Sequence, residues 1–194
     1  MEYKFLTWGP FVFQTKFDKD TLKEIKNLCK KDKKESANHQ LAGHIKEEYN
    51  IDKAKYMELI QPAVISYIEG SRMFYKHNIG ETVEIKGAWV NFMKAGEFNP
   101  PHVHTDCHLS SVLYLDVPNL KKERDEYKGT HHGPGSIEFL YGDVRPLTNN
   151  HFHHVPEEGD FFMFPFNTRH YVSPFKSKGT RISVAANFIV HELK

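Results

Sequence analysis

Residues 96–118 read GEFNPPHVHTDCHLSSVLYLDVP, a histidine-rich segment followed by an apolar strand pattern. Alternate side chains of a β-strand share a face, so His102, His104 and Asp106 are expected to point the same way. Two imidazoles and a carboxylate on one face are hard to explain as packing, because buried polar groups are costly without partners. Both groups are common metal ligands, so the segment predicts a metal site.

Outward from this segment, short strands separated by turn residues fill residues 83–190. Gly- and Pro-containing turns, such as Pro134-Gly135 and Lys178-Gly179, separate them. This spacing predicts a β-sandwich or a squat barrel. The expected strands are residues 83–95, 101–106, 110–117, 136–141, 153–156, 160–166, 170–174 and 180–190.

Residues 1–82 have a different pattern, in which helical periodicity dominates after an opening strand at residues 11–17. One helix is expected from about residue 20 to 31. The longest helical pattern covers residues 53–77, where Pro62 is expected to kink the helix or to begin a second one. These helices are expected to buttress one sheet.

The length, charge and cysteine content of the chain exclude several classes of protein. The 194 residues suit one domain, and 26 Lys plus Arg against 25 Asp plus Glu argue against a nucleic-acid partner. No apolar run reaches the roughly 20 residues of a membrane span, and no signal peptide is evident. Two cysteines, Cys29 and Cys107, cannot build a disulfide framework. A protein of the cytoplasm is therefore expected, with no membrane partner.

A second polar pattern begins at Arg181, in the stretch RISVAANF. Arg181 and Ser183 share a strand face among apolar neighbours. A buried arginine needs an anionic partner, and its planar fork suits a carboxylate. The strand itself contains no acid, so the carboxylate of a ligand is one candidate. A structural salt bridge to Glu138 or Asp160 is the alternative.

The HxD segment, the distant His170 and the Arg181–Ser183 pair together resemble the Fe(II)/2-oxoglutarate-dependent oxygenases over about residues 83–190. Residues 96–118 are similar to the small 2OG-Fe(II) oxygenases of marine bacteria and their phages, a prolyl-4-hydroxylase-like group. The resemblance implies one oxygenase domain over residues 1–194. Its fold would be mainly β with N-terminal helices, a jelly-roll or cupin-like double-stranded β-helix over residues 83–190.

The resemblance also implies iron in a 2-His-1-carboxylate triad, with 2-oxoglutarate chelating the metal. His170 is then the distal ligand. The motif as written supplies His104 and Asp106, and a carboxylate suits Fe(II), so these two are the predicted near ligands. Aligning the stretch GEFNPPH with the prolyl-hydroxylase pattern instead supplies His102 and His104, so His102 is the alternate ligand.

For 2-oxoglutarate, the resemblance implies a clamp on the far carboxylate, formed by Arg181 with Ser183. Tyr114 could donate its hydroxyl to the same molecule, although a core tyrosine is an equal alternative. Asn91, on the first strand of the barrel, could also touch it.

The implied reaction consumes O2 and 2-oxoglutarate, hydroxylates a C–H bond, and releases succinate and CO2. The substrate stays open between a prolyl peptide and a small molecule, and a homodimer is possible. If a phage encodes the chain, the location would be the host cytoplasm. The alternative is a cupin-like three-histidine isomerase or dioxygenase without 2-oxoglutarate. Arg181 favours the oxygenase, because a cupin requires no basic residue facing its metal cavity.

Overall fold

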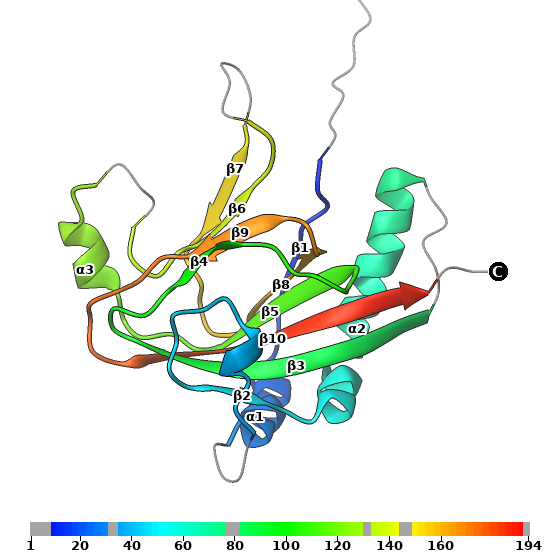
Figure 1. Ribbon diagram of the computed structural model, residues 1–194, viewed down its shortest axis with the longest axis horizontal. Coiled ribbons are helices and arrows are strands. Elements are labelled where there is room, and N and C mark those ends of the chain that lie inside the picture. The colour runs from blue at the N-terminus through cyan, green and yellow to red at the C-terminus, as the bar shows by residue number, and fades with distance from the viewer. Residues whose placement is uncertain (1–8, 31–34, 77–81, 130–132, 144–148, 192–194) are drawn as a thin grey trace, which may run out of the picture.

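The structure is a computed structural model that describes residues 9–30, 35–76, 82–129, 133–143 and 149–191. Two antiparallel sheets face each other, and the longest helix lies across the outer face of the larger sheet (Figure 1). In order across it, the large sheet contains β1 (Phe13–Lys16), β8 (Asp160–Pro165), β5 (Leu109–Asp116), β10 (Thr180–His191), β3 (Thr82–Lys94) and β2 (Glu48–Asn50). The small sheet contains β4 (Asn99–His102), β9 (Arg169–Val172), β6 (Ile137–Leu140) and β7 (His151–His154).

Two helices, α1 (Lys19–Leu28) and α2 (Lys53–Tyr75), precede the barrel strands. Asp18 and Asp52 cap them, each accepting hydrogen bonds from two backbone N–H groups of the first turn. α2 continues through Pro62 as one helix, so the predicted alternative of a second helix start is wrong. Burial of its apolar face offsets the backbone bond that proline removes. No helix among the described residues is long and apolar enough to cross a membrane.

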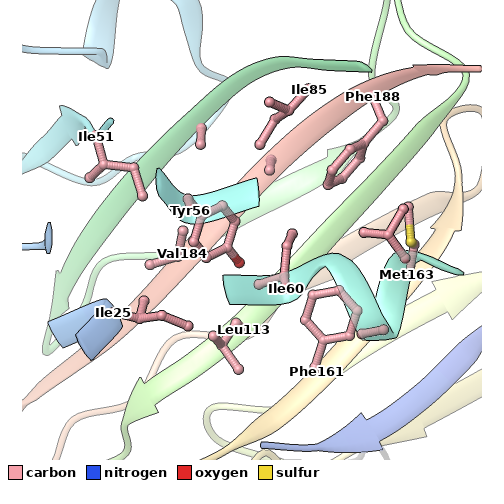
Figure 2. Packing of buried hydrophobic residues seen from close by; sticks show 14 of the residues in the cluster. Ile25, Ile51, Tyr56, Ile60, Ile85, Leu113, Phe161, Met163, Val184 and Phe188 are labelled. Atoms are coloured by element: carbon pink, nitrogen blue, oxygen red, sulfur yellow. The ribbon is translucent and has the colours of Figure 1, made fainter. Parts of the chain in front are cut away.

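One hydrophobic cluster fills the space between the helices and the large sheet (Figure 2). Tyr56 and Ile60 of α2 pack there against Leu113, Phe161 and Val184, and all five are fully buried. Each apolar side chain of this size stabilises the fold by roughly 1.5–3 kcal/mol when buried. The large sheet is therefore held mainly by this cluster.

A second cluster lies between the two sheets, and the alternation of β8 explains both. Phe161 and Met163 face the helices, whereas Phe162 and Phe164 face the small sheet, where Phe139 packs against them. Aromatic contacts between β8 and β6 thus join the two sheets.

The opening strand predicted at residues 11–17 is present as β1, which pairs with β8 in the large sheet. Other elements differ from the prediction. The strand β2, which pairs with β3, was not predicted. A short helix, α3 (Lys121–Glu126), lies in the connection between β5 and β6, and a 3-10 turn, η1 (Asn38–Gln40), precedes β2. The predicted strand at residues 101–106 is wrong beyond His102, because β4 begins at Asn99 and ends at His102.

Candidate metal and co-substrate site

Three histidines from two strand regions converge between the sheets. One ligand atom from each of His102, His104 and His170 lies within 4.8 Å of the others. His102 and His170 are direct cross-strand partners on β4 and β9, and their ring centroids are 4.3 Å apart. His104 lies in the loop that follows β4. Its backbone N–H donates to the backbone carbonyl of Phe166, which holds the loop in place.

Backbone carbonyls orient two of these rings. His102 Nδ1 lies 2.7 Å from the Pro100 carbonyl oxygen, and His170 Nδ1 lies 2.9 Å from that of Thr168. A carbonyl only accepts, so Nδ1 is the protonated nitrogen and the lone pair is on Nε2. The Nε2 atoms of His104 and His170 are 3.4 Å apart. Such backbone bonds to the far ring nitrogen are typical of metal-ligating histidines.

Burial keeps the three imidazoles neutral. It lowers the pKa of His104 to about 4, with a smaller contribution from the nearby His102. It also lowers the pKa of His170 well below its ordinary value and lowers that of His102. Neutral imidazole is the form that binds a metal, so the group is ready to ligate near pH 7.

Asp106, predicted as the carboxylate ligand, lies outside this group. Its side chain is exposed, and its backbone is left-handed with a φ of 54°. Lys86 Nζ donates to its backbone oxygen at 2.6 Å. The alternation that was expected to align Asp106 with His104 stops when the chain leaves β4 at His102, and the left-handed turn then changes the direction of the side chain.

The histidines line a cavity of about 370 Å³ between the sheets. The predicted 2-oxoglutarate residues line the same cavity: Arg181, Ser183, Tyr114 and Asn91. A larger cavity of about 510 Å³ lies near Phe74, Tyr141 and Phe152 and contains none of these groups. The chemistry therefore marks the smaller cavity as the candidate site.

One row of side chains crosses the cavity wall formed by the large sheet. The pairing register aligns Tyr114 of β5 with Ser183 of β10, Ser183 with Asn91 of β3, and Asn91 with Glu48 of β2. All four line the cavity. Three of these residues were predicted from the sequence, and Glu48 was not.

Arg181 is 2% exposed and has no acidic partner among the described residues. One Nη1–H donates to the Gly135 carbonyl at 3.2 Å, and its Nε has no hydrogen-bond partner there. Burial lowers the pKa of Arg181, although not enough to discharge a guanidinium at neutral pH. The alternative prediction was a structural salt bridge from Arg181 to Glu138 or Asp160. The contacts of the described residues do not include this salt bridge. Glu138 is bound by Ser136, Tyr171 and His151, and Asp160 by His154 and the Glu157 N–H.

Two more polar atoms of residues that line this cavity are buried without a partner in the described part of the chain. They are the Tyr114 hydroxyl and the Asn91 Oδ1. Burial raises the pKa of Tyr114 to about 12, so the phenol keeps its proton and can donate. The guanidinium carbon of Arg181 lies 5.6 Å from the Tyr114 ring centroid. The phenol of Tyr114 and the Nε–H of Arg181 are therefore buried donors without a partner among the described residues, and both fit an anionic ligand such as 2-oxoglutarate.

Comparison with known proteins decides the family. Residues 87–187, just over half of the chain, match the family described as "Putative 2OG-Fe(II) oxygenase". The chain belongs to the 2OG-Fe(II) oxygenases. No functionally curated protein matches this oxygenase in sequence. The resemblance predicted from residues 83–190 is confirmed at the level of the 2OG-Fe(II) oxygenase superfamily.

Solved structures similar to the oxygenase include a Pseudomonas putida prolyl-4-hydroxylase, with 15% identity, a TM-score of 0.61, and 93% of this chain and 92% of that one covered. The viral collagen prolyl hydroxylase of Paramecium bursaria Chlorella virus-1, in its 2OG complex, has 13% identity and a TM-score of 0.60, with 93% and 96% covered. A Trichoplax adhaerens prolyl hydroxylase in complex with a hypoxia-inducible-factor peptide has 13% identity and a TM-score of 0.59, with 93% and 83% covered.

These likenesses confirm the predicted mainly β jelly-roll fold and, with the family match, the predicted activity class. The oxygenase depends on Fe(II) and 2-oxoglutarate. The cupin-like alternative without 2-oxoglutarate is therefore set aside. The three-histidine ligand set of that alternative is nevertheless the one that the structure brings together, as His102, His104 and His170.

Proposed function

We propose that the oxygenase, as one domain over residues 1–194, holds Fe(II) with His102, His104 and His170. Arg181 and Ser183 bind the far carboxylate of 2-oxoglutarate, and Tyr114 and Asn91 contact the same molecule. The observation that carries this proposal is the meeting, in one cavity, of three ligand-ready imidazoles and a buried arginine without an acidic partner among the described residues.

The donor set supports each role. Neutral imidazoles suit Fe(II), and a set of three protein ligands would leave coordination positions for 2-oxoglutarate and O2. The planar guanidinium of Arg181 can donate two parallel hydrogen bonds to a carboxylate. The protonated phenol of Tyr114 adds a donor from the neighbouring strand.

When bound, Fe(II) and 2-oxoglutarate supply the activation of O2 that hydroxylates a C–H bond, with release of succinate and CO2. The residues of the chain orient the reactants and exclude water. His102 and His170 are held by backbone carbonyls, so their Nε2 atoms need no rearrangement to ligate. Val112, Ile137 and Phe164 add apolar walls to the cavity.

The substrate is proposed to be either a prolyl-containing peptide or a free small molecule. The similar solved structures support a peptide substrate, because they include prolyl hydroxylases, and one of these enzymes is in complex with a peptide. A cavity of about 370 Å³ admits a side chain or a small molecule, and it does not admit a folded partner.

The test is uncoupled turnover. Purified protein loaded with Fe(II) should slowly convert 2-oxoglutarate to succinate without an added substrate, and this conversion should require O2. Succinate is measured by mass spectrometry, with the His170→Ala variant as the inactive control. If the iron-loaded protein neither turns over nor binds 2-oxoglutarate, the proposal fails.

A further inference from the structure

Glu48 is a buried carboxyl group on the wall of the active-site cavity. The residue is 1% exposed, lies at the start of the edge strand β2, and pairs with Asn91 of β3. It lines the same cavity as the three histidines and Arg181. In the row Tyr114–Ser183–Asn91–Glu48, it lies at the opposite end from the tyrosine that packs against Arg181.

Oxygen atoms that accept hydrogen bonds gather around Glu48. A Cβ placed on Gly43 would lie 3.1 Å from Glu48 Oε1 and would overlap the Oδ1 of Asn99, so both oxygens face the space that this glycine leaves open. The Oδ1 of Asn91, the cross-strand neighbour, is buried without a partner among the described residues. Three residues that line the cavity, on β2, β3 and β4, therefore each carry a side-chain oxygen that can accept a hydrogen bond.

The described residues provide no cation for these oxygens. Among the described residues, the hydrogen bond to the Glu48 carboxyl group comes from Asn38 Nδ2, at 3.3 Å to Oε2. The neighbouring Lys94 pairs with Glu47 instead, at 2.6 Å. Lys86, which also lines the cavity, donates to the Asp106 backbone oxygen. Burial, together with the nearby negative charge of Glu97, raises the pKa of Glu48 to about 7.

A buried acceptor cluster of this kind is costly unless a donor satisfies it. A protonated amine or a guanidinium provides several N–H donors and a positive charge, and both would be favoured next to Glu48 and Glu97. Arg181, by contrast, selects an anion. Opposite charges on the two sides of the cavity would prevent the substrate and 2-oxoglutarate from exchanging places.

We propose that Glu48, with the side-chain oxygens of Asn91 and Asn99, binds a cationic nitrogen group of the substrate and so determines which C–H bond is presented for oxidation. The amide nitrogen of Asn91 remains the group that contacts 2-oxoglutarate in the proposed function. The inference rests on the proposed function, since it takes the histidine group as the reaction centre. The cation is an ammonium or guanidinium group, carried either by a free amine or by the side chain of a peptide.

The experiment measures binding of three probes to protein loaded with Mn(II) and 2-oxoglutarate. The probes are Nα-acetyl-lysine N-methylamide, its neutral analogue Nα-acetyl-norleucine N-methylamide, and pentylammonium. Enhanced relaxation of probe protons by Mn(II) reports binding close to the metal. The variants are Glu48→Gln, which keeps the shape and the acceptor oxygen, and Glu47→Gln, a matched loss of charge at the adjacent residue, which pairs with Lys94.

At least one of the two cations should bind wild type about ten- to a hundredfold more tightly than the norleucine probe, the range of a charge-assisted hydrogen bond. Glu48→Gln should lose this preference and Glu47→Gln should keep it. Tighter binding of the acetyl-lysine probe would indicate a peptide side chain as the substrate group, and tighter binding of pentylammonium would indicate a free amine. Equal binding of cationic and neutral probes by wild type, which needs no variant to fold, overturns the proposal, as does an unchanged preference in Glu48→Gln.

Titration of 2-oxoglutarate and Mn(II) in the same samples separates the two proposals. If both bind and the cations show no preference, the cation site alone is wrong. If wild type binds neither, the proposed function itself has failed.

Discussion

The Nε2 atoms of His104 and His170 lie 3.4 Å apart and their rings stack at 16°, although 66 positions separate the two residues in the chain. If both nitrogens carry lone pairs, no hydrogen lies between them and the lone pairs repel each other. Their approach is then favourable only when a proton or a metal cation binds between them. This contact supports His104 and His170 as a pair of ligands in the proposed metal site, which the HxD motif alone did not predict.

The ligand set can be tested by removing one side chain at a time. His170→Ala and His102→Ala should each lose Fe(II), because each removes one of three converging nitrogens. Asp106→Ala should retain Fe(II), since its side chain is exposed and lies outside the group. Iron stoichiometry under anaerobic conditions measures the outcome. Iron lost in Asp106→Ala but kept in His102→Ala would restore the His104–Asp106 pair.

Arg181→Gln should weaken 2-oxoglutarate binding about ten- to a hundredfold while Fe(II) affinity changes little. The substitution removes the charge and the fork, and a hydrogen bond to a charged group contributes roughly 1.5–3 kcal/mol. Calorimetric titration with 2-oxoglutarate and with pyruvate, which lacks the distal carboxylate, measures the effect. Wild type should strongly prefer 2-oxoglutarate. A variant that discriminates as sharply as wild type would show that Arg181 is structural.

Glu138→Gln should affect stability and leave 2-oxoglutarate binding unchanged. Glu138 is fully buried and accepts hydrogen bonds from Ser136, from the Tyr171 hydroxyl and from His151. Glutamine retains only one acceptor oxygen, so at least one donor is left unsatisfied, at a cost of about 1–3 kcal/mol. Urea unfolding and a 2-oxoglutarate titration measure the two effects. A tenfold loss of 2-oxoglutarate affinity would mean that Glu138 acts on Arg181 after all.

The stability of the protein should depend on pH through Glu48. Folding raises the pKa of this carboxyl from 4.5 to about 7, so the folded state binds a proton more tightly than the unfolded state does. That contribution is fully present below pH 4.5 and is lost as the pH rises to about 7. Because a tenfold difference in proton affinity is worth about 1.4 kcal/mol, the contribution of Glu48 is at most about 3 kcal/mol.

Unfolding of wild type and Glu48→Gln in urea at pH 4.5 and pH 8 isolates this group, because the other titrations cancel in the comparison. The variant should gain stability relative to wild type at the higher pH. A difference that does not change with pH would show that Glu48 ionises in the folded protein as it does in water.

Much of the fold follows from local patterns in the sequence. The period of two residues in β10 predicts its two faces, because alternate side chains must lie on opposite sides of a strand. The apolar spacing of α1 and α2 likewise predicts which face packs on the sheet. Arg181 could be singled out for the same reason, since a charge inside an apolar strand needs a partner.

The site itself depends on relations that no local pattern contains. The cross-strand register of β4 and β9 brings His102 opposite His170, and the left-handed turn at Asp106 removes the expected carboxylate from the group. Glu48 carries no signal in the sequence, because only the pairing of β2 with β3 places it beside Asn91. Residue types and spacing determined which side chains were chemically suited to the site. Register and chain direction, which depend on contacts between distant segments, decided which of them meet.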